Sequence, residues 1–286
     1  MHLGFSSMNT RRDPAPAVLA RALEERGFES LWYGEHSHIP CSLRTPYPGG
    51  GDLPEPYKLI MDPYLSLMAA AAATTTLRLG TGIALLMERE LFSQAKTIAT
   101  LDLLSGGRVL VGAGVGWNRE EFANTTRHPW ERRYAVLRET VAATRALWRE
   151  EQASYRGEFL VFDPVWCAPK PLQPGGPPVL LGAMGPLGTR HAAEWADGWF
   201  PVDFALLPDV AAAIAAFRAQ VRERGRDPDT VPITLQAMLQ PTLDDLLRYR
   251  DAGVARVNVG VSTDVWDKPE AVMPMLDRYA KLIPAL

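Results

Sequence analysis

The sequence is poor in cysteine, has no excess of basic residues and has no long apolar run. Two cysteines among 286 residues cannot form a disulfide framework, so we expect a reducing compartment, the cytoplasm. Thirty basic against 33 acidic residues give a formal net charge of -3, without the basic stripe that nucleic-acid binding requires. The apolar run at residues 65–73 is far shorter than the ~20 residues of a membrane span. The amino terminus lacks a signal-peptide pattern, so we expect neither secretion nor membrane insertion.

What the chain does contain is a regular alternation of short apolar segments with segments of helical spacing. The expected strands are residues 2–7, 30–34, 77–84, 108–111, 178–182, 198–201, 231–236 and 256–260. The expected helices are residues 14–26, 62–73, 91–104, 130–148, 187–196, 207–224, 242–252 and 269–282. Such alternation indicates a parallel sheet, and eight units at this length favour a closed (β/α)8 barrel over an open sheet. We therefore predict an α/β fold, one TIM-barrel domain over residues 1–286, with insertions after strands 2 and 4 and before strand 5.

The fourth expected strand runs into alternating glycines, Gly112, Gly114 and Gly116, and then into the polar residues 117–121. Glycines at a strand end allow another backbone or a flat ligand to approach closely. This pattern indicates the mouth of a binding site, and the alternative is a tight strand-to-helix turn without a ligand. It is not a dinucleotide fingerprint, because Trp117 stands where the third glycine of that motif would be.

In a barrel of this type the site lies at the carboxyl ends of the strands. The acid/base pair at such an end is Glu35 and His36, and a histidine can exchange a proton near neutral pH. The alternative is a histidine that caps a loop. His36 and His38 together raise a second class of function, a metal-dependent hydrolase, which would need further ligands from His2, His128 or His191.

Two other strand ends carry glycine-rich turns. Gly82 and Ile83 end the third strand, where glycine suggests a bulge or a flat group against the backbone. The turn Ala183-Met184-Gly185-Pro186 leads into a helix whose free N–H groups could bind an anion, the alternative being a flexible turn. Met87, Trp117, Trp199 and Phe200 either wall an apolar slot or belong to the core. The Pro- and Gly-rich residues 40–56 indicate a lid or binding loop after the second strand.

Five segments together resemble the luciferase-like monooxygenase superfamily, and within it the branch of oxidoreductases that depend on the deazaflavin coenzyme F-420. The resemblance runs from Leu3 to about Trp199, and the last third of the chain matches only in its strand–helix rhythm. The segments are Trp32-Tyr-Gly-Glu-His36, Leu77-Arg-Leu-Gly-Thr-Gly-Ile83, Thr100-Leu-Asp-Leu-Leu-Ser-Gly-Gly-Arg108, Val111-Gly-Ala-Gly-Val-Gly-Trp-Asn-Arg-Glu-Glu-Phe122 and Asp197-Gly-Trp199.

The resemblance implies a (β/α)8 barrel that holds an isoalloxazine-like ring in its mouth. It implies a cis peptide between Gly82 and Ile83, and a catalytic pair at Glu35 and His36. In that pair His36 would stabilise or protonate the substrate oxygen or carbon during hydride transfer. The implied cofactor-binding residues are Gly82, Ile83, Gly114, Val115, Gly116, Trp117, Ala183, Met184, Gly185 and Pro186, the phosphate lying on Ala183 to Gly185.

Some relatives that oxidise sugar phosphates have a catalytic glutamate where this chain has Trp117. That difference argues against a sugar-phosphate substrate and leaves the proton donor open, with Glu120 and Glu121 either substituting for it or capping the next segment.

The resemblance thus implies an oxidoreductase that transfers a hydride between coenzyme F-420 and a small carbonyl, enone, imine or alcohol. An FMN-dependent monooxygenase that uses oxygen is the alternative, followed by the metal-dependent hydrolase and by a barrel that binds a cofactor without catalysis. We expect a homodimer with a small-molecule substrate and no metal.

Overall fold

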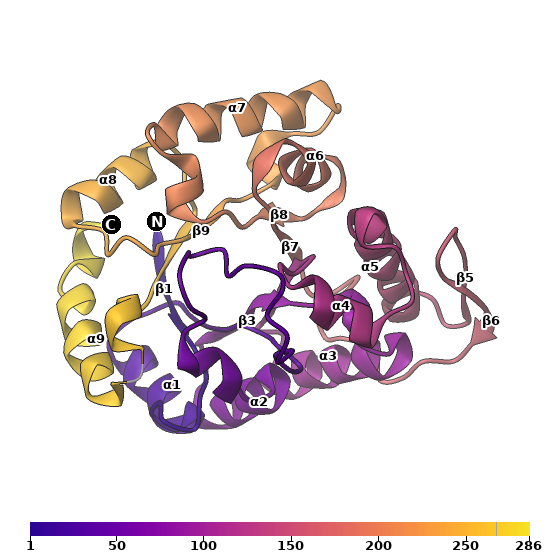
Figure 1. Cartoon of the computed structure of the whole chain (residues 1–286), viewed down its shortest axis with the longest axis horizontal. Coiled ribbons are helices and arrows are strands. Elements are labelled where there is room, and N and C mark those ends of the chain that lie inside the picture. The colour runs from indigo at the N-terminus through magenta and orange to yellow at the C-terminus, as the bar shows by residue number, and fades with distance from the viewer. Residues whose placement is uncertain (267) are drawn as a thin grey trace.

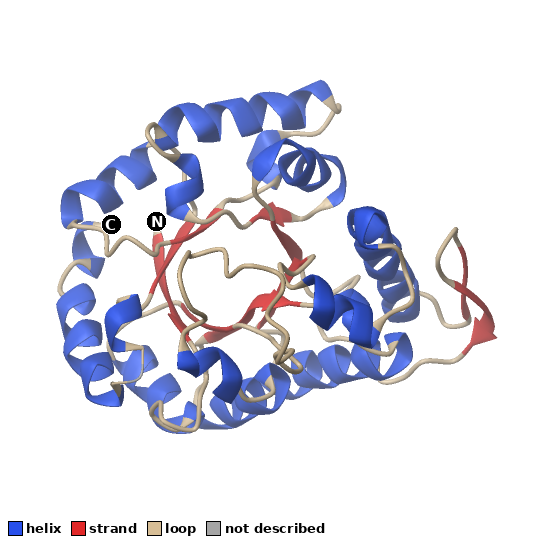
Figure 2. Cartoon of the chain, in the orientation of Figure 1, coloured by secondary structure: helices blue, strands red, loops and turns tan. Residues whose placement is uncertain are grey.

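The computed structural model describes residues 1–266 and 268–286, and a parallel eight-stranded sheet lies at its centre. The strands are β1 (His2–Ser7), β2 (Ser30–Tyr33), β3 (Arg78–Ala84), β4 (Val109–Gly114), β7 (Val179–Gly182), β8 (Gly198–Trp199), β9 (Thr234–Gln236) and β10 (Arg256–Val259). They follow the order β8-β7-β4-β3-β2-β1-β10-β9, and parallel bridges Trp199–Ile233 and Val202–Gln236 join the two ends. The sheet therefore closes into a ring (Figure 2), and the predicted barrel is confirmed.

Helices surround this ring on the outside (Figure 1). They are α1 (Pro16–Glu25), α2 (Pro63–Ala73), α3 (Leu91–Ser105), α5 (Arg133–Arg149), α6 (Gly185–Trp195), α7 (Val210–Glu223), α8 (Leu243–Asp251) and α9 (Val272–Ala280). Local signals fix their ends: the Asp62 carboxylate accepts the N–H groups of Tyr64 and Leu65 at the start of α2, and Gly106 ends α3 in the left-handed conformation. Over the described residues, every helix falls short of the length and apolar character that a bilayer crossing requires.

The barrel interior is filled by its own side chains. Trp32, Leu110, Leu180 and Phe200 are buried there together, with Ile83 packed against them, and the rings of Trp32 and Phe200 lie 5.1 Å apart. Trp199 points outward and stacks on Phe217 at 4.3 Å. Phe200 and Met87 thus belong to the core rather than to the wall of an apolar slot.

Close packing also explains several glycines that the sequence pattern assigned to a ligand. A Cβ on Gly112 would overlap the carbonyl oxygen of Thr81 and press on the Phe200 ring. A Cβ on Gly114 or Gly182 would overlap the side chain of Ile83. The expectation of bare backbone at Gly114 was therefore wrong, because the chain's own atoms use the space that these glycines leave.

Three insertions interrupt the regular alternation, as predicted. The segment between β2 and α2 crosses the barrel mouth and contains the short helix η1 (Glu55–Leu59) (Figure 1). After β4 come the helix α4 (Arg119–Thr125) and η3 (Trp130–Arg132). Before β7, the antiparallel hairpin of β5 (Ala153–Arg156) and β6 (Val161–Val165) stands off the barrel. The helix α4 is an addition to the predicted elements, since the sequence pattern left residues 123–129 as an irregular insertion.

Candidate active site at the barrel mouth

The carboxyl ends of the strands converge beneath the segment that follows β2, which we call the lid loop (residues 34–62). Figure 2 looks along the barrel and shows this loop lying across the opening. Also at the rim, the Ser6 hydroxyl of β1 donates a hydrogen bond to Oε1 of Gln236 at the end of β9, over 2.7 Å. The barrel thus brings together polar groups that are 230 residues apart.

The central chemical feature of the mouth is a pair formed by His36 and Glu121. His36 Nδ1 lies 2.6 Å from Glu121 Oε2, and the two side chains are only 9% and 2% exposed. Glu121 Oε1 accepts the backbone N–H of Ser37 at 3.0 Å. Because a carboxylate oxygen accepts, the ring proton of this pair sits on Nδ1, and Nε2 is left without a hydrogen-bond partner among the described residues.

Helix α4 holds Glu121 in place. The Oδ1 atom of Asn118 caps this helix by accepting the N–H groups of Glu120 and Glu121, each at 3.0 Å. The cap fixes the first turn, so the Glu121 carboxylate points back at the end of β2. The signal that could have revealed α4 was an asparagine followed by two glutamates in the first turn, a pattern typical of a helix start.

Glu35 does not pair with His36, and this corrects the predicted Glu35–His36 pair. Its Oε2 accepts the N–H of Leu85 at 2.8 Å, and its Oε1 pairs with Nε of Arg89, which also binds Asp62 at 2.7 Å. Burial raises the pKa of the Glu35 carboxyl against the opposing charge of Arg89. Side chains of consecutive residues at a strand end point to opposite sides. Glu35 therefore binds Leu85 and Arg89 at the rim and does not face His36.

A third carboxyl lies beside the pair, and sequence reasoning missed it. Glu88 Oε2 accepts a hydrogen bond from the Thr125 hydroxyl at 3.1 Å. Burial, and then the negative charge of Glu121, raise the pKa of Glu88 to about 8. The carboxyl of Glu88 is therefore mainly protonated at pH 7. The site thus holds a second proton, on Glu88, beside the His36–Glu121 pair.

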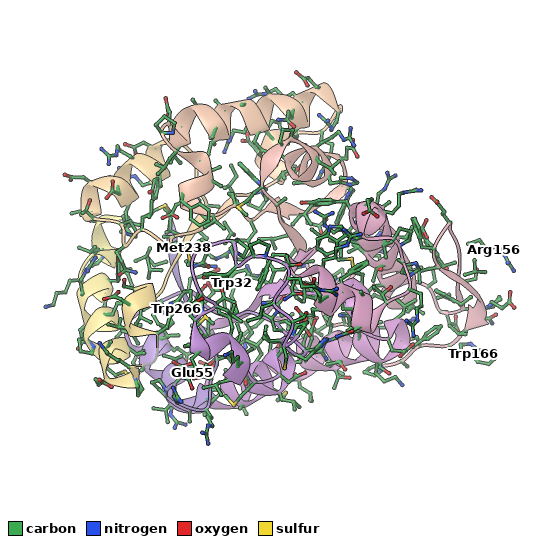
Figure 3. All side chains as sticks on the ribbon, viewed as in Figure 1. Trp32, Glu55, Arg156, Trp166, Met238 and Trp266 are labelled. Atoms are coloured by element: carbon green, nitrogen blue, oxygen red, sulfur yellow. The ribbon has the colours of Figure 1, made fainter. Side chains whose placement is uncertain are left out.

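Aromatic rings cover His36. We call Tyr47, Tyr57, Trp117 and Trp266 the aromatic enclosure. The His36 ring lies 5.5 Å from that of Tyr57 and 5.8 Å from that of Trp117. Tyr57 lies 5.9 Å from Trp266, which comes from the carboxyl-terminal side of the mouth (Figure 3). Every contact is edge-to-face. The polar atoms of the enclosure are two phenol hydroxyls and two indole N–H groups, of which that of Trp266 donates to the carbonyl of Val261.

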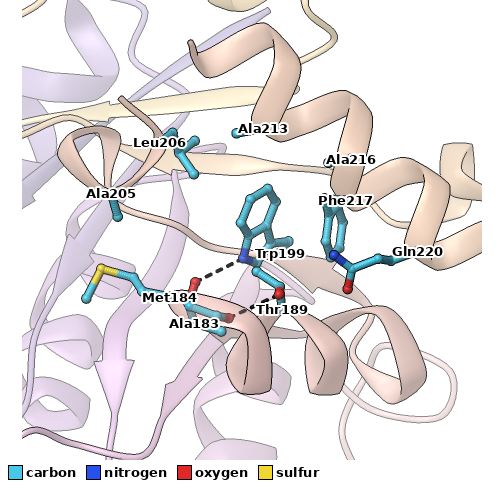
Figure 4. Close-up of a pocket in the computed structure, with 11 residues that line it drawn as sticks. Ala183, Met184, Thr189, Trp199, Ala205, Leu206, Ala213, Ala216, Phe217 and Gln220 are labelled. Atoms are coloured by element: carbon cyan, nitrogen blue, oxygen red, sulfur yellow. Dashed lines mark hydrogen bonds between the residues drawn. The ribbon is translucent and has the colours of Figure 1, made fainter. Parts of the chain in front are cut away.

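The turn after β7 borders a cavity of about 200 Å³. Figure 4 shows Trp199 and Phe217 on one side of it and Met184 on the other. No side chain caps the amino terminus of α6, where Met184 is the capping residue. Gly185 has a φ of 71°, and a Cβ there would meet nothing within 4 Å. Free N–H groups beside an open cavity fit the phosphate of a flavin-type cofactor, with Ala183, Met184, Gly185 and Pro186 at its edge.

The end of β3 has the conformation that the resemblance implied. The peptide bond between Gly82 and Ile83 is cis, and the register with β4 shifts between Thr81 and Ala84. Both residues are half-buried at the rim. On the neighbouring strand end, Val115 is buried, while Gly116 and Trp117 are partly exposed. The predicted cis peptide and the predicted bulge are confirmed.

The histidines do not gather around one point. His38 contacts the Ser37 hydroxyl through Nδ1 and the Asn124 amide through Nε2, both at 2.9 Å. His191 of α6 stacks on Tyr134 of α5. Within residues 1–266 and 268–286, no three His, Cys, Asp or Glu side chains come together in a way that could hold a metal ion.

Comparisons with known proteins agree on one family. A sequence model of luciferase-like monooxygenases matches residues 11–262. The chain is 40% identical over 270 residues to the uncharacterized protein Rv0953c of Mycobacterium tuberculosis (strain ATCC 25618 / H37Rv), covering 91% of this chain and 92% of that protein. It is 30% identical over 216 residues to the F420-dependent hydroxymycolic acid dehydrogenase of the same strain, covering 74% of this chain and 55% of that enzyme.

Among solved structures, an F420-dependent secondary alcohol dehydrogenase in complex with an F420-acetone adduct has the same barrel. The superposition gives a TM-score of 0.72 and covers 96% of this chain and 98% of that one, at 19% sequence identity. At this identity the likeness concerns the fold alone.

Proposed function

This chain belongs to the luciferase-like monooxygenase family, and from that premise we propose that it transfers a hydride between coenzyme F-420 and a small organic carbonyl, enone, imine or alcohol. The observation that carries the proposal is the His36–Glu121 pair. It lies at the carboxyl rim of the barrel, between the end of β3 and the aromatic enclosure. Hydride transfer to a carbonyl needs a proton for the oxygen, and this pair supplies one.

His36 is the proposed catalytic acid/base. Glu121 holds its Nδ1 at 2.6 Å, which fixes the ring and presents Nε2 to the mouth. In the reducing direction Nε2 gives a proton to the substrate oxygen, carbon or nitrogen. In the oxidising direction it takes the proton from an alcohol. The Glu121 carboxylate stabilises the imidazolium that carries the extra proton, as a carboxylate does in other His–carboxylate pairs.

The cofactor would lie over the rim formed by Gly82 and Ile83 and by the strand end from Gly114 to Trp117, with Gly114 itself covered by the side chain of Ile83. Its phosphate would lie on Ala183, Met184, Gly185 and Pro186, where α6 begins without a side-chain cap. When bound, the deazaflavin ring supplies the hydride acceptor or donor, and the protein supplies orientation and the proton. At Gly185 a Cβ would meet nothing within 4 Å, whereas at Gly116 it would come within 3.2 Å of the Leu85 side chain.

Two observations favour F-420. One is the 30% identity to an enzyme whose name includes F420 dependence. The other is the His36–Glu121 pair, which can supply the proton that hydride transfer to a carbonyl requires. The family is named for monooxygenases, so an FMN-dependent reaction with oxygen is the second candidate. We also propose a cytoplasmic homodimer.

Cofactor titration tests the proposal. We expect F-420 to raise the melting temperature by about 4–6 °C at 100 times its dissociation constant, since ligand binding then adds about 2.7 kcal/mol, and FMN at the same concentration to raise it by less than 1 °C. His36→Ala and Glu121→Gln should retain F-420 affinity and lower kcat by about 10²-fold or more, the usual contribution of a general acid or base. Stabilisation by FMN together with oxygen consumption, and none by F-420, would select the monooxygenase instead.

A further inference from the structure

The lid loop carries an aromatic residue into the site. The Tyr47 ring lies 5.3 Å from that of Tyr57 and 5.9 Å from that of Trp117, which are the two rings that flank His36. Its hydroxyl is 3.4 Å from the Tyr57 hydroxyl. Three aromatic rings thus fill the volume above the proposed proton donor.

The loop is shaped to place that ring. The backbone turns directly after it, where Gly50 N–H donates to the Tyr47 carbonyl at 3.0 Å and Gly50 has a φ of 78°. A Cβ on Gly49 would overlap the Tyr47 ring, so only glycine allows the side chain to fold back over the turn.

The Glu120 carboxylate joins residues 44 and 45 of the lid loop to α4, the helix that also carries Glu121. Glu120 Oε2 accepts the hydroxyl of Thr45 at 2.7 Å and its N–H at 3.2 Å. Arg44 pairs with the other oxygen of Glu120 at 3.3 Å, from a side chain that is 78% exposed. Consecutive residues of α4 therefore hold the two parts of the site: Glu121 binds His36, and Glu120 binds the lid loop. The contacts of Glu120 with Arg44 and Thr45 are few and lie at the surface, so contacts with a ligand can replace them.

Three arginines around the mouth are already paired. Arg89 binds Glu35 and Asp62, Arg119 binds Glu131 at 3.3 Å, and Arg44 binds Glu120. An anionic substrate would give up its hydration without gaining a free counter-ion from them. A cation would gain from the aromatic faces that Tyr47 leaves, but it would give up its hydration at a position that a neutral ring fills when the lid is closed. A neutral ring is therefore the closer replacement for Tyr47.

We propose that Tyr47 occupies the substrate position in the closed lid, and that the site takes an uncharged, planar carbonyl compound of about the size of one aromatic ring. The substrate class rests on the proposed function, because it assumes that the carbonyl meets His36. Binding displaces Tyr47, releases Thr45 from Glu120 and leaves the faces of Trp117 and Tyr57 for the incoming ring. Selectivity for neutral molecules follows from the enclosure itself.

Equilibrium dialysis with three matched probes tests this without turnover. The probes are acetophenone, 4-acetylbenzoate and 4-acetyl-N,N,N-trimethylanilinium, which share a ring and a ketone and differ in charge. We expect the wild-type protein, with or without F-420, to bind acetophenone at least ~10-fold more tightly than either charged probe. Equal or tighter binding of a charged probe overturns the proposal.

Variants of the lid loop test whether Tyr47 is a placeholder, that is, a side chain that occupies the substrate position until the substrate binds. Tyr47→Ala should bind acetophenone at least ~5-fold more tightly than wild type, because the competing ring is gone. Thr45→Val should shift affinity in the same direction, and Tyr47→Phe should stay within ~2-fold of wild type. Tyr155→Ala, in the distant hairpin, is the matched control. Unchanged or weaker binding by Tyr47→Ala overturns the placeholder. If F-420 fails to bind while the probe preferences and the effect of Tyr47→Ala hold, the proposed function and the carbonyl assignment fail, and the role of Tyr47 as occupant of a site for a neutral ring stands.

Discussion

Glu88 makes the site sensitive to pH through a single side chain. Its pKa is raised to about 8 by burial and by the neighbouring Glu121 charge. Below pH ~4.5 the carboxyl is protonated in both the folded and the unfolded protein. Between pH ~4.5 and 8 only the folded protein keeps the proton, so the free energy of unfolding falls as the pH rises.

We therefore expect Glu88→Gln to be more stable than the wild type at pH 8, by on the order of 3 kcal/mol, and to lose that advantage near pH 4.5. The amide still accepts the Thr125 hydroxyl, so the native contact is kept. Urea unfolding at pH 5, 6.5 and 8 measures the difference. Glu151→Gln, at an exposed position, serves as the control. Parallel stability curves for wild type and Glu88→Gln would contradict a raised pKa.

At the same scale, the sequence identified the histidine of the site but not its partner. His36 could be found because it follows a buried strand in a fold whose chemistry gathers at strand ends. Glu121 is 85 residues away, and only its position near the glycine stretch drew attention to it. Glu35 was the nearer acid in sequence, yet the alternation of side chains turns it toward Arg89. Adjacency along a strand end is therefore a poor guide to which acid meets which base.

Helix α4 connects stability to catalysis at the level of one element. Asn118 satisfies the N–H groups of Glu120 and Glu121, so Asn118→Ala should lower the free energy of unfolding by about 1 kcal/mol. We expect a larger effect on activity, about a 10-fold loss of kcat/KM, because the first turn that holds Glu121 loosens and a small misplacement of a catalytic group is costly.

A second helix cap gives the control for that prediction. Asp209 accepts the N–H of Ala212 at 2.9 Å at the start of α7, away from His36. Asp209→Ala should cost a similar amount of stability and leave kcat/KM unchanged. Urea unfolding and steady-state kinetics on both variants measure the two effects. If both variants lose activity in proportion to their stability, α4 has no special role in positioning Glu121.

The regular elements could be predicted because the strands are apolar runs between turn residues, and because several helices end at a glycine such as Gly106. The sequence pattern could not show which atoms pack against each glycine in the folded barrel. Gly112 and Gly114 were interpreted as backbone bared for a ligand, and in the structure they admit Thr81, Phe200 and Ile83. The missing Cβ is visible in the sequence, but the atom that occupies its place depends on the register of the closed barrel.

For the whole molecule, the outer face of α2 is the surface that we propose for the contact between the two copies of the proposed homodimer. The helix is apolar almost all round, PYLSLMAAAAA, and its one serine is buried. A helix of that composition is expected to be covered on every side. Yet Leu65 is 75% exposed, and Ala69 and Ala72 lie on the same outer face. In a homodimer, the neighbouring α2 would cover this stripe.

We therefore expect Leu65→Asp to convert a dimer into a monomer, because a buried unpaired carboxylate at a symmetric interface faces its own copy. Sedimentation velocity at micromolar concentration measures the change. The control is Trp166→Asp, which places the same charge on a side chain that is 77% exposed at the hairpin (Figure 3), away from the barrel, and should leave the dimer intact. A monomeric wild type would contradict the homodimer. A Leu65→Asp variant that stays dimeric would place the interface elsewhere than α2.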